Sequence, residues 1–361
     1  MCLCPSTIPN PWYGKNRVAR YAKTAWRHDC ESARIYIPCG VCRECVALKQ
    51  MYLVQRVQME SLDSFLFFTT LTYDDVHLPH YICDNGYSIP FADTQHLQLL
   101  FKRLRNDNAF GRPFRYLAVS ERGSKRGRPH FHILWFLPKY QNESFADALF
   151  LETRLSRVIR DAWCVNLGSK RVPKYVPLFT YHEKYVDGKL RTNYDTHFVR
   201  PSLTADGVSS VAFYVCKYML KGSNKERRLQ QALRLNLTPE EYDIVFGIVK
   251  SKTLRSSSFG LGFPENTSGI ISRLKKGIQL SKASSKFPMF YAPDSQKTFP
   301  LCPYYRMRGD IFTERDWLDF HMSDPSVFMD FDKTVTECKN GDSVLSKQIS
   351  LMELHDLSLD F

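Results

Sequence analysis

Long apolar runs are missing from this sequence. No stretch of its 361 residues approaches the ~20 consecutive apolar residues that a membrane span needs. The opening segment "MCLCPSTIPNPWYGKNRVAR" also lacks the apolar core of a secretory signal. These absences predict a cytoplasmic protein with no membrane partner. A G-x-x-x-x-G-K-[ST] phosphate loop is absent as well, which argues against ATPase or helicase activity.

A disulfide framework is not expected either. The chain has eleven cysteines, an odd number, and the cytoplasm keeps thiols reduced. Cys39, Cys42 and Cys45 nevertheless have the spacing of metal ligands. Four further residues are candidates for a fourth ligand: Cys2, Cys4, Cys30 or His28. Two interpretations stay open, a structural Zn²⁺ site or a set of reduced, packed thiols.

Positive charge is unevenly distributed along the chain. The net charge is +13, and residues 310–361 carry twelve acidic and four basic side chains, a balance of −8. The first 309 residues therefore carry +21, which favours nucleic acid as the partner. The acidic end is either a partly ordered appendage or a competitor of DNA for the basic surface. Six side chains are candidates to contact DNA phosphates: Lys102, Arg103, Arg105, Lys125, Arg126 and Arg128.

Strands and helices alternate along the middle of the sequence. Apolar, β-rich segments predict strands over 65–73, 114–121 and 128–137, and the tight "RGSKRGRP" turn predicts that the last two form a hairpin. Helical spacing of apolar residues predicts helices over 48–60, from Thr94 onward, over 143–163 and over 209–221. The segments around Pro79 to Pro90 and "SKTLRSSSFGLGF" are expected to be loops. With 43% hydrophobic and 14% aromatic residues, this pattern predicts an α+β fold with a mainly antiparallel central sheet flanked by helices.

The strand "RPHFHILWFL" carries two histidines near its start. His130 and His132 leave the same face of a strand, with Cα atoms about 6–7 Å apart, so both can reach one ion. Glu121 ends the preceding strand, and the hairpin brings it beside them. Two imidazoles and a carboxylate suit Mn²⁺, or Mg²⁺ where it is more abundant, with coordination positions left open. A pair of hydrogen-bonded structural histidines is the alternative.

The segment "AFYVCKYMLKG" places two phenols between two ammonium groups. On a helix, Tyr214, Lys217, Tyr218 and Lys221 form one continuous stripe. A phenol beside a divalent cation is a nucleophile for phosphorus, and the lysines can hold a phosphate and favour the phenolate. The alternative is a surface stripe whose long side chains reach solvent. Together with the metal ligands, the stripe predicts cleavage of a phosphodiester through a phosphotyrosine.

At this point the sequence resembles a known family. The segments "FFTTLTYDD", "RPHFHILWF" and "YVCKYMLK" occur in the order seen in rolling-circle replication initiators of the HUH superfamily. More closely, the chain resembles the initiators of microviruses, in particular gokushoviruses, which also carry segments like "PCGVCREC" and "RSSSFGLG". The match extends from about Pro38 to Gly262. Where the family often has Gly-Glu-Tyr-Gly this chain has "SERGS", so the sequence around Glu121 departs from the family pattern.

The resemblance implies a division of the chain and a role for each site residue. It implies an HUH nicking domain with an RRM-like or ferredoxin-like core, which we place over 61–265. The flanking parts are a Cys-rich, basic segment over 1–60 with the candidate zinc site, and a C-terminal region over 266–361 that is basic and then acidic. His130, His132 and Glu121 would bind the metal, Tyr214 and Tyr218 would be the nucleophiles, and the tyrosine helix would pack across the sheet. The implied location is the host bacterial cytoplasm. The implied partners are single-stranded origin DNA of the phage genome, a host helicase and the replicative DNA polymerase.

Other functions are compatible with parts of the pattern. A transposase or plasmid initiator would share the same chemistry. A conjugative relaxase usually has its tyrosine ahead of the histidine motif, the reverse of the order here. A non-catalytic, zinc-bearing nucleic-acid-binding protein would use the histidines structurally and the tyrosine and lysine stripe only to hold phosphates.

Overall fold

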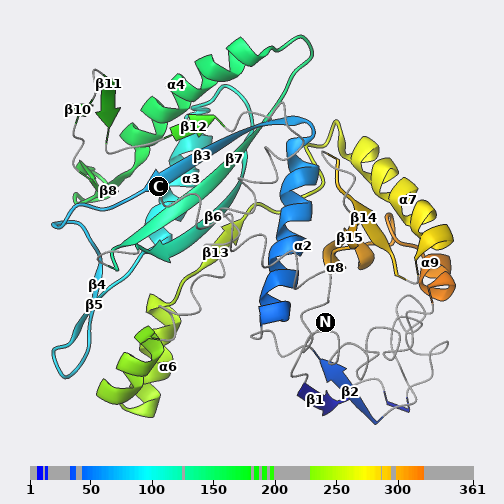
Figure 1. Ribbon diagram of the computed structural model, residues 1–361. Coiled ribbons are helices and arrows are strands. Elements are labelled where there is room, and N and C mark those ends of the chain that lie inside the picture. The colour runs from blue at the N-terminus through cyan, green and yellow to red at the C-terminus, as the bar shows by residue number, and fades with distance from the viewer. Residues whose placement is uncertain are drawn as a thin grey trace. The chain divides into compact units, whose positions relative to one another are not determined.

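The structure is a computed structural model (Figure 1). It describes residues 6–10, 13–14, 33–37, 43–123, 127–179, 183–186, 189–192, 196–198, 228–285, 287–293 and 298–320. The chain divides into two compact units: one comprises Met1–Gln55 with Ser268–Phe361, the other Arg56–Thr267. The three-part division implied by the resemblance stays a prediction. In the described part of the chain, no helix is both long enough and apolar enough to span a membrane.

The unit of Arg56–Thr267 contains a five-stranded sheet in the order β12-β3-β7-β6-β13. Its strands are β3 (Ser64–Leu71), β6 (Arg115–Arg122), β7 (Pro129–Pro138), β12 (Thr196–Phe198) and β13 (Thr253–Arg255). Every neighbouring pair is antiparallel. The prediction of an α+β fold with an antiparallel central sheet flanked by helices is therefore confirmed, as is the β6–β7 hairpin.

The other elements of this unit are helices and short strands. The helices are α3 (Thr94–Asn106), α4 (Phe145–Ala162), α6 (Pro239–Val249) and the last residues of α2 (Arg43–Ser61). The short antiparallel pairs are β4 (His80–Ile82) with β5 (Ser88–Pro90), β8 (Cys164–Asn166) with β9 (Tyr175–Pro177), and β10 (Glu183–Val186) with β11 (Lys189–Thr192).

One face of the sheet carries the main apolar core. Side chains alternate between the two faces of a strand, and the odd-numbered residues of β3 and β7 point to this core. The apolar stripe of α3 packs against them through Leu97, Leu100, Phe101 and Leu104, together with α4. The even-numbered residues of β7, including both histidines, lie on the opposite face. β7 is buried along nearly its whole length because both faces are covered, which explains its almost unbroken apolar sequence.

Two segments predicted to be loops contain regular structure. The segment around Gly86 forms the β4–β5 hairpin, whose Cys83 and Ile89 pack against Leu233, Val245 and Val249 of the following helices. The prediction of a loop was wrong here because tertiary packing stabilises strands of only three residues. Likewise Thr253–Arg255 of "SKTLRSSSFGLGF" pairs with β6 as the edge strand β13.

The rest of "SKTLRSSSFGLGF" is a loop held by one buried carboxylate. Glu60, at the end of α2, accepts hydrogen bonds from the backbone N–H groups of Gly260 and Gly262 at 2.7 and 3.1 Å. Arg115 of β6 donates to the same carboxylate at 3.2 Å. Gly260 and Gly262 have φ of 97° and 66°, a conformation that glycine adopts at little cost. The Glu60 carboxylate therefore ties the loop to both a helix and the central sheet, and Arg56 of α2 adds a hydrogen bond to the carbonyl of Phe259 at 2.9 Å.

The second unit contains the remaining elements. They are β1 (Ser6–Pro9), β2 (Arg34–Ile37), the first part of α2, α7 (Thr267–Ser284), β14 (Met289–Tyr291), β15 (Thr298–Pro300), α8 (Pro303–Arg306) and α9 (Glu314–Asp319). Lys282 of the basic helix α7 lies 2.6 Å from Asp316 and 2.7 Å from Asp319. The beginning of the acidic C-terminal region is thus an ordered part of this unit.

We expect removal of the Glu60 carboxylate to destabilise the protein strongly. Glu60→Ala leaves Arg115 and two backbone donors without their partner, a loss of about 3–5 kcal/mol in the free energy of unfolding. Denaturant titration measures this. Glu265→Gln, at an exposed carboxylate, is the control and should change stability by less than about 0.5 kcal/mol. Equal stability of the two variants would contradict this role of Glu60.

Candidate metal centre

The pairing of three strands brings the predicted metal ligands together. In the register of β6 and β7, Glu121 lies directly opposite His130. In the register of β3 and β7, Thr70 lies opposite His132. All four side chains leave the sheet on the face away from α3 and α4, because they share the same parity along paired strands. Residues distant in sequence therefore meet at one point near the centre of the sheet.

The two imidazoles present the same nitrogen atom to this point. Nδ1 of His130 lies 3.1 Å from the carbonyl oxygen of Arg128, which can only accept, so Nδ1 carries the proton and Nε2 its lone pair. Nδ1 of His132 lies 3.0 Å from the hydroxyl of Thr70, and this ring also stacks on Phe68. Supporting hydrogen bonds of this kind fix the ring orientation of metal-binding histidines.

The ligand atoms are spaced as one ion requires. The two Nε2 atoms are 3.0 Å apart, and Oε2 of Glu121 lies 3.2 Å from Nε2 of His132 and 3.6 Å from Nε2 of His130. Two atoms about 2.1 Å from one ion lie about 3.0 Å apart at a right angle and about 3.4 Å apart at the tetrahedral angle. The three residues therefore fit a single divalent cation. Among the described residues, this is the one group of three His, Cys, Asp or Glu side chains whose ligand atoms all lie within 4.8 Å of one another.

The surroundings of Glu121 and His132 favour the protonation states in which these side chains bind a metal ion. Burial opposes ionisation of Glu121, but the interaction of its carboxylate with the imidazoles of His130 and His132 outweighs burial and lowers the pKa of Glu121 to about 2. Burial also lowers the pKa of His132, and the neighbouring Glu121 opposes this only in part. At neutral pH the carboxylate is therefore ionised and the His132 ring neutral, the forms that bind a divalent cation.

The predicted nucleophile helix cannot be placed against this site. Tyr214, Lys217, Tyr218 and Lys221 lie outside the residues that the structure describes. So do Lys125, Arg126, Cys39 and Cys42. Cys45 is described as a buried thiol of α2. The roles of all these residues stay predictions.

The other predicted DNA-binding side chains lie mostly on the far side of the sheet. Lys102, Arg103 and Arg105 belong to α3, on the opposite side of the sheet from the metal ligands. Arg103 donates to the carbonyl groups of Ala162 and Cys164 at the end of α4, at 3.0 and 2.7 Å. The guanidinium of Arg105 lies 4.8 Å from the centre of the Phe114 ring. Their contact with DNA stays a prediction.

Arg128 lies next to the metal ligands in sequence and holds a strand end. Its guanidinium pairs with Asp75 and donates to the carbonyl of Tyr73 at 2.6 Å. Asp74 accepts from the backbone N–H of His77 at 2.8 Å. The two aspartates thus form a polar strand end.

Sequence reasoning missed the role of Thr70. A threonine in the otherwise apolar strand "FLFFTTLTY" was the available signal, but its partner depends on the register between strands some 60 positions apart.

Comparison with known proteins agrees with this geometry. Residues 66–223 match a family model of replication-associated proteins of the ORF2 type. The Replication-associated protein ORF4 of Chlamydia phage 1 is 24% identical over 291 residues, covering 77% of this chain and 62% of that protein. The Replication-associated protein ORF2 of Spiroplasma virus 4 is 30% identical over 142 residues, covering 37% of this chain and 44% of that protein. The chain is therefore similar to replication-associated proteins of two viruses of bacteria, which agrees with the predicted resemblance to microvirus initiators.

The match to replication-associated proteins covers the candidate metal site but not the whole of either relative. The chain spans less than two thirds of the length of both viral proteins. The matched residues include all three metal ligands and also the segment of Tyr214 and Tyr218. No solved structure matches the chain.

We expect this initiator-like chain to lose Mn²⁺ binding when any ligand is removed. His132→Ala removes one of three ligand atoms, and Glu121→Gln replaces the charged carboxylate with a neutral amide, so affinity should fall by more than about 100-fold in each, beyond the range for changes to supporting groups. Titration followed by electron paramagnetic resonance measures free Mn²⁺. His80→Ala, at an exposed imidazole of β4, is the control and should bind as the unchanged chain does. Undiminished binding by both ligand variants would rule out this site.

Thr70→Val tests the supporting hydrogen bond. The substitution keeps the shape of the side chain but leaves Nδ1 of His132 without its partner, so Mn²⁺ affinity should fall by about 10- to 100-fold. The same titration measures it. Thr153→Val, on the exposed side of α4, serves as the matched control. Equal affinities for the two variants would mean that Thr70 does not orient His132.

Proposed function

We propose that the chain is a metal-dependent, site-specific endonuclease and ligase of single-stranded DNA that initiates rolling-circle replication. The observation that carries the proposal is the convergence of Nε2 of His130, Nε2 of His132 and Oε2 of Glu121 within 4.8 Å. The similarity to replication-associated proteins of two bacterial viruses supports it. The positive charge of the chain supports a DNA substrate.

His130, His132 and Glu121 would hold Mn²⁺ or Mg²⁺, with Mn²⁺ the better match to a mixed nitrogen and oxygen ligand set. When bound, the cation would act as a Lewis acid on the scissile phosphodiester. The backbone carbonyl of Arg128 accepts from Nδ1 of His130 and so sets its tautomer, and the Thr70 hydroxyl orients His132 through its contact with Nδ1. The chain thus supplies a prearranged set of ligand atoms.

The nucleophile in this proposal is Tyr214 or Tyr218. Its phenolic oxygen bonds to phosphorus, the bond from phosphorus to the 3′ oxygen breaks, and the phenolic proton passes through solvent to the freed 3′ oxygen. Lys217 and Lys221 would hold the phosphate and favour the phenolate. The 5′ end stays joined to tyrosine as a phosphodiester, so attack by a 3′-OH reverses the step and reseals DNA without ATP.

The partners in this proposal follow from the chemistry. The substrate is single-stranded origin DNA of a phage genome, in the cytoplasm of the bacterial host. Because the sequence lacks an ATP-binding loop, a host helicase would separate the strands. The host replicative DNA polymerase would extend the free 3′-OH.

A covalent adduct is the expected product of the full chain with single-stranded DNA and Mn²⁺. A denaturing gel should show labelled DNA that migrates with the protein. The adduct should disappear in His130→Ala and in the double variant Tyr214→Phe, Tyr218→Phe, because each lacks either a metal ligand or both nucleophiles.

Two controls separate chemistry from folding. His80→Ala and Tyr140→Phe alter an exposed imidazole and an exposed phenol and should leave adduct formation intact. DNA binding without an adduct, for origin sequences from related phages and with either metal, would instead favour the non-catalytic nucleic-acid-binding alternative. An adduct that persists in the double tyrosine variant would overturn the assignment of the nucleophiles.

A further inference from the structure

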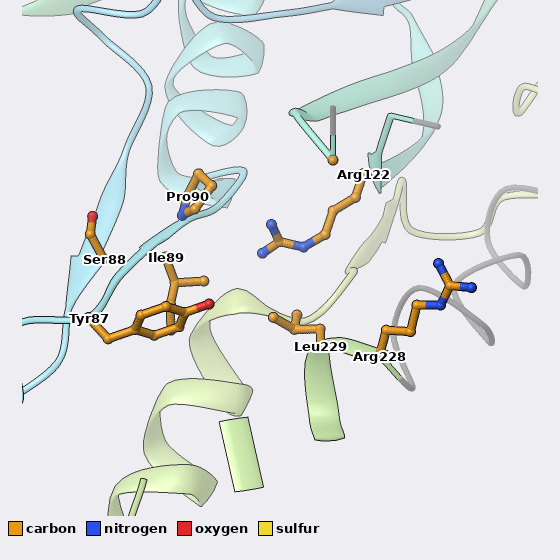
Figure 2. A pocket seen from close by; sticks show the side chains of 8 residues that line it. Tyr87, Ser88, Ile89, Pro90, Arg122, Arg228 and Leu229 are labelled. Atoms are coloured by element: carbon orange, nitrogen blue, oxygen red, sulfur yellow. The ribbon is translucent and has the colours of Figure 1, made fainter. Parts of the chain in front are cut away.

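A pocket of about 290 Å³ lies at the end of β6, beyond the metal ligands in sequence (Figure 2). Three segments line most of it: the β4–β5 hairpin with Tyr87, Ile89 and Pro90, the end of β6 with Arg122, and the start of the helical residues 228–236 with Arg228 and Leu229; Gly127, just before β7, completes the lining. In Figure 2 the guanidinium of Arg122 extends into the space between the hairpin and the segment of Arg228 and Leu229. All three segments belong to the unit that carries the metal ligands.

The charge of this pocket is positive. Arg122 and Arg228 contribute two guanidinium groups, and none of the lining residues is acidic. Nη2 of Arg122 donates to the carbonyl of Val249, at the end of α6, at 3.2 Å. This bond fixes the position of one guanidinium. The pocket therefore suits an anion such as a DNA phosphate.

The remaining walls are apolar and include an aromatic ring. Ile89 is buried, Leu229 and Pro90 are partly exposed, and 44% of Tyr87 is accessible to solvent. An exposed tyrosine beside aliphatic side chains is a platform on which an unpaired base can stack. The volume is at the lower end of the range for small-molecule pockets, which fits one nucleotide unit.

The pocket is close to the metal ligands along β6. Arg122 directly follows Glu121, with Cα atoms about 3.8 Å apart, and successive side chains of a strand point to opposite faces. Suppose that a single-stranded DNA has one phosphate at the metal ligands. If the DNA then passes around the end of β6, its next nucleotide is within reach of the pocket.

We propose that this pocket binds one nucleotide of the single-stranded substrate next to the scissile phosphate, with Tyr87 stacking on the base and Arg228 contacting a phosphate. The inference rests on the proposed nicking function.

Fluorescence anisotropy of the full chain with a labelled oligodeoxythymidine, in EDTA and over a range of salt concentrations, tests the pocket without metal or cleavage. Tyr87→Ser should weaken binding by about five- to a hundredfold through loss of stacking. Arg228→Gln should reduce the slope of log affinity against log salt by about 0.7, the value for one phosphate contact on a single strand. Both side chains are exposed, so neither substitution should disturb the fold.

Matched substitutions elsewhere on the same unit serve as controls. Tyr140 is also 44% exposed, and Arg157 is an exposed arginine of α4, so Tyr140→Ser and Arg157→Gln should bind as the unchanged chain does. Suppose that the pocket variants bind like these controls while the unchanged chain forms a covalent adduct with origin DNA. The proposed binding of a nucleotide in the pocket is then overturned, and the proposed nicking function stands. If the pocket variants lose DNA binding but the unchanged chain forms no adduct with any metal, nucleotide binding in the pocket is supported and the proposed nicking function is overturned.

Discussion

The antiparallel register of β6, β7 and β3 is the constraint on which the site depends. It sets Glu121 opposite His130 and Thr70 opposite His132. A shift of either pairing by one residue would send the shifted side chains to the other face of the sheet. The apolar core opposes such a shift, because the same alternation that places the ligands on one face buries Trp135, Ile133 and Phe131 on the other. Core packing and ligand placement are thus two results of one pattern.

The two faces of the sheet have different tasks. The face covered by α3 and α4 is apolar, and each large side chain fully buried there contributes roughly 1.5–3 kcal/mol to folding. On the other face, Glu121 and His132 are largely shielded from water. There the carboxylate, its pKa lowered to about 2, and the neutral imidazole have the forms that the proposed cation site requires. A rigid, buried strand between the two faces is a suitable support for such a site because its side chains have little freedom to move.

Much of this arrangement could be predicted from the sequence because it follows from local patterns. The alternation in "RPHFHILWFL" predicts that both histidines share a face, and the short turn before it predicts that Glu121 lies beside them. The stripe of Leu97, Leu100, Phe101 and Leu104 likewise predicts the buried side of α3. Features that depend on contacts between distant segments could not be predicted in this way. The hydrogen bond between Thr70 and His132 requires the β3–β7 register, and the attachment of the glycine-rich loop requires Glu60, some 200 positions earlier.

The central claim is that His130, His132 and Glu121 bind one divalent cation. Anomalous diffraction from crystals grown with Mn²⁺ tests it most directly. The account predicts a single strong peak about 2.2 Å from Nε2 of both histidines and from the Glu121 carboxylate. A fully occupied Mn²⁺ at another position, with these three side chains bonded only to one another, would contradict it.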